Sequence, residues 1–373
     1  MSPTADVETE PQTLAGLATP ALVIDGAVVR RNLARMADYS RRYGLAVRPH
    51  AKTHKSLKLA RLQIEAGAIG LTVAKVGEAE VMSEATDDLL LAYPAVDPAR
   101  TARLARLAAR RTVRVAVDTA RAVEVLGEAA RSAGSVIGLL VEIDVGLGRT
   151  GVAGPAEALA LAQTIDQTRG VRLDGLMCYP GQIWDPADRQ SGPLGGVAAK
   201  LAATVDRWRA SGLAARIVSG GSTPTAYQSH LVPAYTEIRP GTYLFNDMNT
   251  VRGGYCALDD CAARIVCTVV SDAVPGHVVV DAGSKTLAAD LCHPARESGH
   301  GHVVGFPRAR IVRLSEEHGQ IDVRDCPDRP RVGDRLTLVP NHVCPCVNLH
   351  DAVWWMEDGR FERLPIDARG KLS

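Results

Sequence analysis

The stretch VRVAVDTARAVEVLGEAARSAGSVIGLLVEIDV, residues 113–145, reads as one strand–helix–strand unit. Its two ends, 113–118 and 137–145, are β-type apolar runs, and an alanine-rich helical pattern lies between them. Strands that alternate with helices predict parallel pairing, because a crossover helix returns the chain to the same edge of the sheet. The unit therefore indicates an α/β fold.

The same alternation extends outward in both directions. Strands are expected at 21–25, 45–50, 70–75, 88–93, 113–118, 137–145, 173–179 and 215–220. Eight strands separated by helical patterns favour a closed (β/α)8 barrel of the TIM type. A doubly wound open sheet is the alternative fold.

The pattern changes near residue 255. The later segments are short strand-like runs divided by Gly, Pro and Asp turns, which is typical of an antiparallel β domain. We expect a barrel over 21–254 and a C-terminal β domain over 255–373. Residues 1–20 form an N-terminal segment that could add to the β domain.

Composition excludes several classes of protein. The net charge is +1, which argues against general nucleic-acid binding. No apolar run reaches the roughly 18 residues of a membrane span, and the acidic start is unlike a signal peptide. The 8 cysteines therefore read as reduced thiols, and we expect a cytoplasmic protein.

The segment RPHAKTHK, residues 48–55, concentrates basic groups at the end of an expected strand. In a barrel of this kind the chemistry lies where strands end. Lys52 is at the centre, and neighbouring cations make loss of its proton easier. A neutral amine is what a Schiff base with a carbonyl cofactor requires. The alternative interpretation is a solvated basic loop.

The segment SGGSTPT, residues 219–225, follows the last expected barrel strand. Gly220 and Gly221 allow close approach of the backbone to an anion, and Ser222 and Thr223 offer hydroxyl and amide donors. Barrel enzymes commonly bind phosphate in their last βα loops. The alternative is a flexible turn without a ligand.

The segment DVGLGRTG, residues 144–151, contains the pattern G-x-G-x-x-G. A dinucleotide site is a weak interpretation, because the pattern lies inside the series of β/α units and does not open a Rossmann half. Arg149 in this segment is a better candidate for a functional residue, since it could bind a ring nitrogen or a carboxylate. The alternative is a surface arginine in a turn. Tyr179 lies at the end of an expected strand, where its side chain could reach the opening of the barrel or pack at the barrel rim.

The segment PNHVCPCVNLHD, residues 340–351, suggests a metal site. On an extended strand His342 and Cys344 would point to one face, and imidazole with thiolate is half of a tetrahedral zinc site. Cys346 would share that face, and His350 follows a little later. The alternative is a hydrogen-bonded histidine beside half-buried cysteines.

Taken together, TPALVID, RPHAKTHKS, AKVGEAEVM, EIRPGTYLFND, DAGSK and PNHVCPCVNL resemble the D-threonine aldolase and D-serine dehydratase family. These are fold-type III pyridoxal phosphate enzymes, more distantly related to alanine racemase. The resemblance covers about residues 18 to 355. PHAKTHK and NHVC are its most specific segments.

The resemblance implies roles for individual residues. Lys52 would carry pyridoxal phosphate, and Arg149 and Tyr179 would face its ring. His342 and Cys344 would bind a divalent metal, for which the thiolate favours zinc over manganese or magnesium. The phosphate would lie at Gly221, Ser222, Thr223, Gly241 and Tyr243.

The resemblance also implies a lyase acting on D-β-hydroxy-α-amino acids. We lean towards retro-aldol cleavage of D-threonine-like substrates to glycine and an aldehyde. The alternative is dehydration of D-serine or D-hydroxyaspartate to a keto acid and ammonia, which the H-x-C pair favours. A racemase, a pyridoxal phosphate carrier and a nicotinamide-dependent oxidoreductase rank lower. We expect a small-molecule D-amino acid as partner, no nucleic acid, no membrane, and a homodimer.

Overall fold

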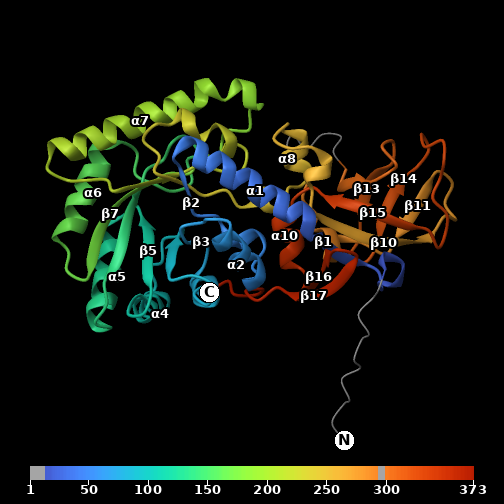
Figure 1. Ribbon diagram of the computed structural model, residues 1–373, viewed down its shortest axis with the longest axis horizontal. Coiled ribbons are helices and arrows are strands. Elements are labelled where there is room, and N and C mark those ends of the chain that lie inside the picture. Colours follow the sequence, from blue (N-terminus) through green and yellow to red (C-terminus); the bar gives the residue numbers. More distant parts are fainter. Residues whose placement is uncertain (1–12, 293–298) are drawn as a thin grey trace, which may run out of the picture. The chain divides into compact units, whose positions relative to one another are not determined.

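The computed structural model describes residues 13–292 and 299–373, and its contacts divide the chain into two units (Figure 1). The barrel unit comprises 33–243, 253–256 and 367–373. The sheet unit comprises the described residues up to Asn32, together with 244–252 and 257–366. The chain therefore passes between the units several times, whereas the sequence analysis expected a single passage near residue 255.

The barrel unit contains an eight-stranded parallel sheet in the order β2-β9-β8-β7-β6-β5-β4-β3. A parallel bridge from His50 to Thr72 joins the two end strands, so the sheet curls into a TIM-like barrel as predicted. The strands are β2 (Ala46–Val47), β3 (Leu71–Val73), β4 (Asp88–Leu91), β5 (Thr112–Val117), β6 (Ile137–Glu142), β7 (Val171–Met177), β8 (Ile217–Gly220) and β9 (Glu237–Ile238).

One expected barrel strand was wrong and one was missed. Residues 21–25 form β1 (Ala21–Asp25), which pairs with β10 and β16 of the sheet unit. The eighth barrel strand is β9, whose two residues are too short to show a periodic pattern. As a result, the Lys52 segment follows the first barrel strand and the SGGSTPT segment follows the seventh.

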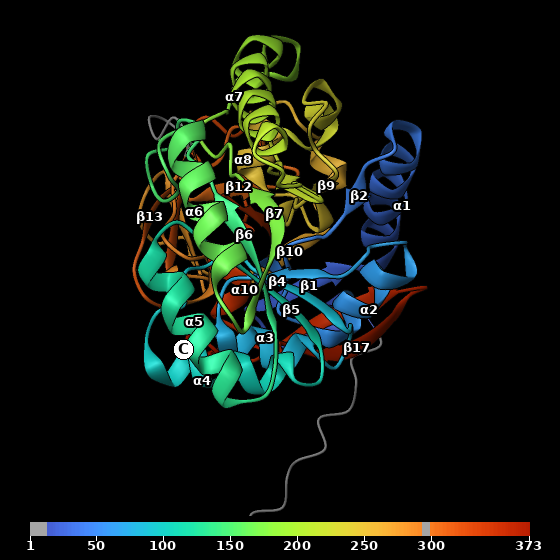
Figure 2. The ribbon, with the colours of Figure 1, turned by 90° about the vertical axis from the view of Figure 1, so that its left-hand side faces the viewer.

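Helices cover the outer face of this sheet, and Figure 2 shows α4, α5, α6 and α7 around the strands. Local signals start several of them: the Asp97 carboxylate accepts the Arg100 amide at 3.0 Å before Pro98, and the Thr119 hydroxyl accepts the Ala122 amide at 3.2 Å. The helices are α1 (Gly26–Tyr43), α2 (Leu57–Glu65), α3 (Val76–Met82), α4 (Pro98–Ala108), α5 (Ala120–Ser132), α6 (Pro155–Gln167) and α7 (Ser191–Ala210).

Inside the barrel, apolar side chains share the space with charges. Leu90, Ala116, Leu140 and Met177 from four neighbouring strands form one buried cluster. Among the described residues, no helix combines the length and hydropathy that crossing a bilayer requires.

A buried ion network links the barrel strands. Arg48, just after β2, lies 3.0 Å from Glu237 of β9 and 2.6 Å from Asp88 of β4. Arg114 of β5 continues the network to Asp88 and, at 2.9 Å, to Asp174 of β7. Since buried charges are tolerated only when paired, this network fixes which strand ends lie together.

The sheet unit is built on a nine-stranded sheet with the path β13-β14-β11-β10-β1-β16-β17, to which β15 and β12 are added through β10. All pairs are antiparallel except β1 with β16. Its other strands are β10 (Ala263–Ser271), β11 (His277–Val280), β12 (Gly301–Val303), β13 (Arg310–Leu314), β14 (Gly319–Asp322), β15 (Arg335–Pro340), β16 (Ala352–Glu357) and β17 (Arg360–Pro365).

The sheet unit also holds three short helices, α8 (Met248–Arg252), α9 (Ser284–Leu287) and α10 (Val343–Asn348). The described part of the N-terminal segment joins this unit, because the Arg335 guanidinium donates to the carbonyls of Leu14 and Leu17 at 2.8 and 2.7 Å. Residues 13–20, the described part of the expected 1–20 segment, therefore pack with the β domain, and residues 1–12 lie outside the described residues.

Replacement of Arg48 by methionine should destabilise the barrel unit by about 3–5 kcal/mol, because the buried Glu237 carboxylate loses its cation. Arg41→Met is the matched control: Arg41 pairs with Asp38 in solvent, and its loss should cost at most about 0.5 kcal/mol. Urea unfolding followed by circular dichroism measures both values. Equal effects of the two substitutions would contradict a structural role for the buried pair.

Candidate active site

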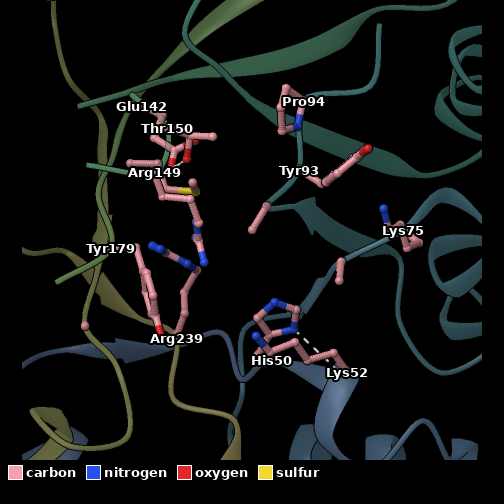
Figure 3. A pocket seen from close by; sticks show the side chains of 14 residues that line it. His50, Lys52, Lys75, Tyr93, Pro94, Glu142, Arg149, Thr150, Tyr179 and Arg239 are labelled. Carbon is pink, nitrogen blue, oxygen red and sulfur yellow. Dashed lines mark hydrogen bonds between the residues drawn. The ribbon is translucent and has the colours of Figure 1, made fainter. Parts of the chain in front are cut away.

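A cavity of about 340 Å³ opens at the carboxyl ends of the barrel strands (Figure 3). Its walls come from the ends of β2, β3, β4, β6, β7, β8 and β9 and the segments that follow them. This is the end of a TIM-type barrel at which active sites are built. The cavity contains the predicted residues Lys52, Arg149, Tyr179 and Gly221.

In the RPHAKTHK segment, Arg48 and Lys55 form ion pairs with carboxylates, and Lys52 does not. Arg48 is neutralised by Glu237 and Asp88, and the Lys55 ammonium lies 3.3 Å from Glu78. Among the described residues, no carboxylate lies within ion-pair distance of Lys52, which sits in a 3-10 turn (Ala51–Thr53) and faces the cavity. The sequence shows a basic cluster, but the fold leaves one lysine without an acidic partner.

The two histidines of this segment accept backbone hydrogen bonds and so stabilise the local chain conformation. His50 Nδ1 accepts the Lys52 amide at 3.4 Å, the bond drawn in Figure 3. His54 Nδ1 accepts the Ser56 amide at 3.1 Å, and its Nε2 lies 3.1 Å from Gln63 Oε1. Burial lowers the pKa of His54 to about 4, and burial with the nearby Lys52 and Arg239 cations lowers the pKa of His50 well below its usual value. Both imidazoles are therefore neutral near pH 7.

Arg149 and Tyr179 form one wall of the cavity. The guanidinium carbon of Arg149 lies 4.8 Å from the Tyr179 ring centroid, a cation–π geometry that holds both side chains. The buried Glu142 carboxylate lies on the same wall and accepts the Thr150 hydroxyl at 2.9 Å. Burial raises the pKa of Glu142.

The glycines around Arg149 serve the turn and not a dinucleotide. The Asp144 carboxylate accepts the amides of Gly146 and Gly148 at 3.1 and 3.0 Å, and Asp118 accepts that of Gly151 at 3.0 Å. All three glycines have positive φ, which other residues rarely adopt. Their amides thus donate to carboxylates of the protein. The turn places Arg149 in the lining of the cavity.

Most residues of the expected phosphate site lie in or next to the cavity, and Tyr243 does not. Gly221 lines it at φ +77°, the Ser222 amide and hydroxyl meet the Thr225 hydroxyl at 3.2 and 3.0 Å, and the Gly241 amide donates to Thr223 at 3.3 Å. Tyr243 does not line the cavity. Its buried hydroxyl accepts the Gln63 amide at 3.3 Å.

The expected metal pair lies in the sheet unit and not on a strand. His342 is the N-cap of α10, so Cys344 is in the first turn of a helix, and the strand alternation assumed from the sequence is wrong. His342 Nδ1 lies 3.1 Å from Asp290 Oδ1, and the imidazole also interacts with the Cys344 side chain. A carboxylate at Nδ1 fixes the tautomer that leaves Nε2 for a metal.

The two further candidates do not join this pair. The Cys346 thiol donates to the Thr286 carbonyl at 3.2 Å, and His350 Nε2 lies 3.2 Å from the same oxygen. In the part of the chain that the structure describes, no group of three or more His, Cys, Asp or Glu side chains could hold a metal ion. His342 and Cys344 therefore remain a two-residue candidate, and a metal held by them would have positions open to solvent or substrate.

Two family models match the chain, one over each part of the sequence. Residues 24–249 match the alanine racemase N-terminal domain, and residues 262–356 match a putative serine dehydratase domain. The chain is 35% identical to a D-threonine aldolase from an Arthrobacter species, with 96% of this chain and 94% of that protein covered. The chain belongs to the D-threonine aldolase and D-serine dehydratase family.

Other members of this family have different names. A 3-hydroxy-D-aspartate aldolase from Paracoccus denitrificans is 32% identical, with 95% and 92% coverage. A D-threo-3-hydroxyaspartate dehydratase from a Delftia species is also 32% identical, with 89% and 92% coverage. The solved D-threonine aldolase of Filomicrobium marinum has a TM-score of 0.90 at 32% identity and covers 98% of this chain and 99% of its own. The family therefore contains both carbon–carbon and carbon–oxygen lyases.

Sequence reasoning missed several residues of this cavity. Arg239 lines it, with its guanidinium fixed by the Ser219 hydroxyl and the Cys178 carbonyl, both at 2.7 Å. Glu142 was a weak signal, an acid at the end of the apolar run 137–142, and Arg239 belongs to EIRPG. Lys75 and Tyr93 also line it, and neither had a local pattern that marked it.

Protonation of His54 should make the protein less stable in mild acid. An unfolded histidine binds a proton near pH 6.5, whereas folded His54 resists it to about pH 4. Stability is then complete above pH 6.5 and falls towards pH 4 by on the order of 3 kcal/mol. Urea unfolding at several pH values should show a flatter profile for His54→Gln. The exposed His318→Gln is the control, and an unchanged slope in His54→Gln would contradict the assignment.

Replacement of Cys344 by alanine should weaken zinc binding by at least about tenfold, since the two-residue site loses its thiolate. Cys346→Ala is the matched control, because that buried thiol already donates to Thr286 and should leave zinc affinity within about twofold. Metal content after dialysis and a competition titration with a chromogenic chelator measure both. If only Cys346→Ala released zinc, the assignment of the ligands would be wrong.

Proposed function

We propose that this protein is a pyridoxal phosphate- and divalent metal-dependent lyase that cleaves D-threonine-like D-β-hydroxy-α-amino acids to glycine and an aldehyde. The observation that carries the proposal is Lys52, a cavity lysine without a carboxylate partner among the described residues, surrounded by Arg149, Tyr179 and Gly221. The 35% identity to a D-threonine aldolase over 96% of the chain supports this branch of the family.

The cavity fits the proposed cofactor. Lys52 supplies the amine that its aldehyde requires, and Arg149 with Tyr179 offers a planar surface beside it. At the Gly220–Gly221 turn, side chains are excluded: a Cβ on Gly220 would lie 2.1 Å from the Tyr235 ring. Gly221 lines the cavity without a side chain, so its backbone could approach a phosphate next to the hydroxyls of Ser222 and Thr223.

The residues of the sheet unit fit a divalent metal. Imidazole and thiolate together favour zinc, and with only two protein ligands a metal would keep open positions. Manganese or magnesium is the alternative. When bound, pyridoxal phosphate would supply an electron sink for a carbanion at Cα, and the metal a Lewis acid for the β-hydroxyl.

The side chains of the cavity have assigned tasks in this proposal. Lys52 would hold the cofactor through its amine, and the same amine, when free, could accept a proton from a substrate in the cavity. Arg149 and Tyr179 orient the ring, and Arg239 and Arg149 together supply the positive potential that an amino acid carboxylate requires. His50, neutral and bonded to the Lys52 amide, positions the lysine.

Dehydration of D-serine or D-hydroxyaspartate is the second candidate. It is favoured by the H-x-C pair, and a D-threo-3-hydroxyaspartate dehydratase is 32% identical. The two reactions differ in the proton that leaves: cleavage requires loss of the β-hydroxyl proton, whereas dehydration requires that Lys52 takes the proton from Cα. A racemase, which would need no metal, ranks below both. We further propose a homodimer located in the cytoplasm.

Product analysis decides between these reactions. Protein loaded with pyridoxal phosphate and zinc or manganese should convert D-threonine to acetaldehyde and glycine, with little keto acid or ammonia. Lys52→Ala should lose this activity and the visible absorbance of the bound cofactor, because the other lysine of the cavity, Lys75, projects from a different strand end. Keto acid with ammonia from D-serine would identify a dehydratase. Undiminished turnover by Lys52→Ala would remove Lys52 from the site.

A further inference from the structure

The wall of the cavity opposite Arg149 and Tyr179 carries a second lysine (Figure 3). Lys75 is the N-cap of α3 and lines the cavity. Its ammonium lies 3.7 Å from the centroid of the Tyr93 ring, which also lines the cavity. A cation–π contact this close restrains an otherwise flexible side chain, so the ammonium is held at that wall.

The acidic residues nearest to Lys75 in the sequence form ion pairs with other basic residues. The Glu78 carboxylate lies 3.3 Å from the Lys55 ammonium and accepts the Ala74 amide at 2.7 Å. Glu80 forms an ion pair with Arg103 at 2.6 Å. Within residues 13–292 and 299–373, no carboxylate reaches ion-pair distance of Lys75. The half-buried amine of Lys75 therefore packs on the Tyr93 ring without a described carboxylate partner, so it is available to an anion that enters the cavity.

The other cations of the cavity already have tasks. Lys52 is the proposed cofactor lysine, and Arg239 is anchored to Ser219 and Cys178. Arg149 presents a planar guanidinium, which suits the bidentate recognition of the carboxylate that every amino acid carries. Lys75 is a point charge on the far wall, and none of these tasks requires it.

We propose that Lys75 binds a second carboxylate, carried on the substrate side chain, so that acidic D-β-hydroxy amino acids bind more tightly than neutral ones such as D-threonine, which remain substrates. Tyr93 is the positioning residue that holds the ammonium. This inference rests on the proposed function for the identity of the α-amino acid substrate, but it concerns binding and can be tested without turnover.

The test uses two D-amino acids that lack a β-hydroxyl and cannot undergo either proposed reaction. Isothermal titration calorimetry measures the Kd of D-aspartate and of D-alanine for the cofactor- and metal-loaded protein. The variants are Lys75→Gln, which removes the charge, and Lys75→Arg, which keeps it. Lys371→Gln, an exposed lysine of the same unit, removes an equal charge outside the cavity.

Lys75→Gln should raise the Kd of D-aspartate by about 10- to 100-fold, the value of one charge-assisted hydrogen bond, and change that of D-alanine by no more than about twofold. Lys75→Arg should retain most of the affinity, and Lys371→Gln all of it. Equal losses for both ligands would mean that Lys75 serves the α-carboxylate or the fold, and would overturn the proposal. So would a wild-type protein that binds D-aspartate no better than D-alanine. Product analysis judges the lyase activity separately.

Discussion

The buried ion pair between Arg48 and Glu237 is the constraint on which the barrel depends. It joins the ends of the first and last barrel strands, each only two residues long, and extends through Asp88 to a third. Strands this short have few ladder hydrogen bonds, so side-chain charges provide the specificity that longer strands obtain from register. The turn that carries Lys52 begins at Ala51, three residues after Arg48, so this pair constrains its position.

The same pairing sets the chemistry of the cavity. Acids neutralise Arg48 and Lys55, and burial keeps His50 and His54 without charge. Lys52 is the basic residue of this segment that is left without an acidic partner among the described residues. The proposed cofactor lysine thus differs from Arg48 and Lys55 in that it forms no ion pair with any carboxylate that the structure describes.

Much of this could be predicted from residue patterns. Seven of the eight barrel strands follow from apolar runs between helical segments, and Arg149, Tyr179 and Gly221 were placed at strand mouths because chemistry gathers there. The errors share a cause. The segment 21–25 has the composition of a barrel strand, but only its pairing with β10 and β16 decides its sheet. His342 and Cys344 are two residues apart on a strand or at a helix start, and the spacing alone could not distinguish them.

The sequence by itself determined the class of fold, the family, and the residue types that the chemistry needs, because strand and helix periods and short motifs are local properties of the chain. The tertiary structure alone decided which cation lacks a partner, that Arg239 and Glu142 reach the cavity, that Tyr243 does not, and that Lys75 faces Arg149 across it. The physical reason is that burial and ion pairing join residues tens to hundreds of positions apart, such as Arg48 with Glu237, and no local pattern records them.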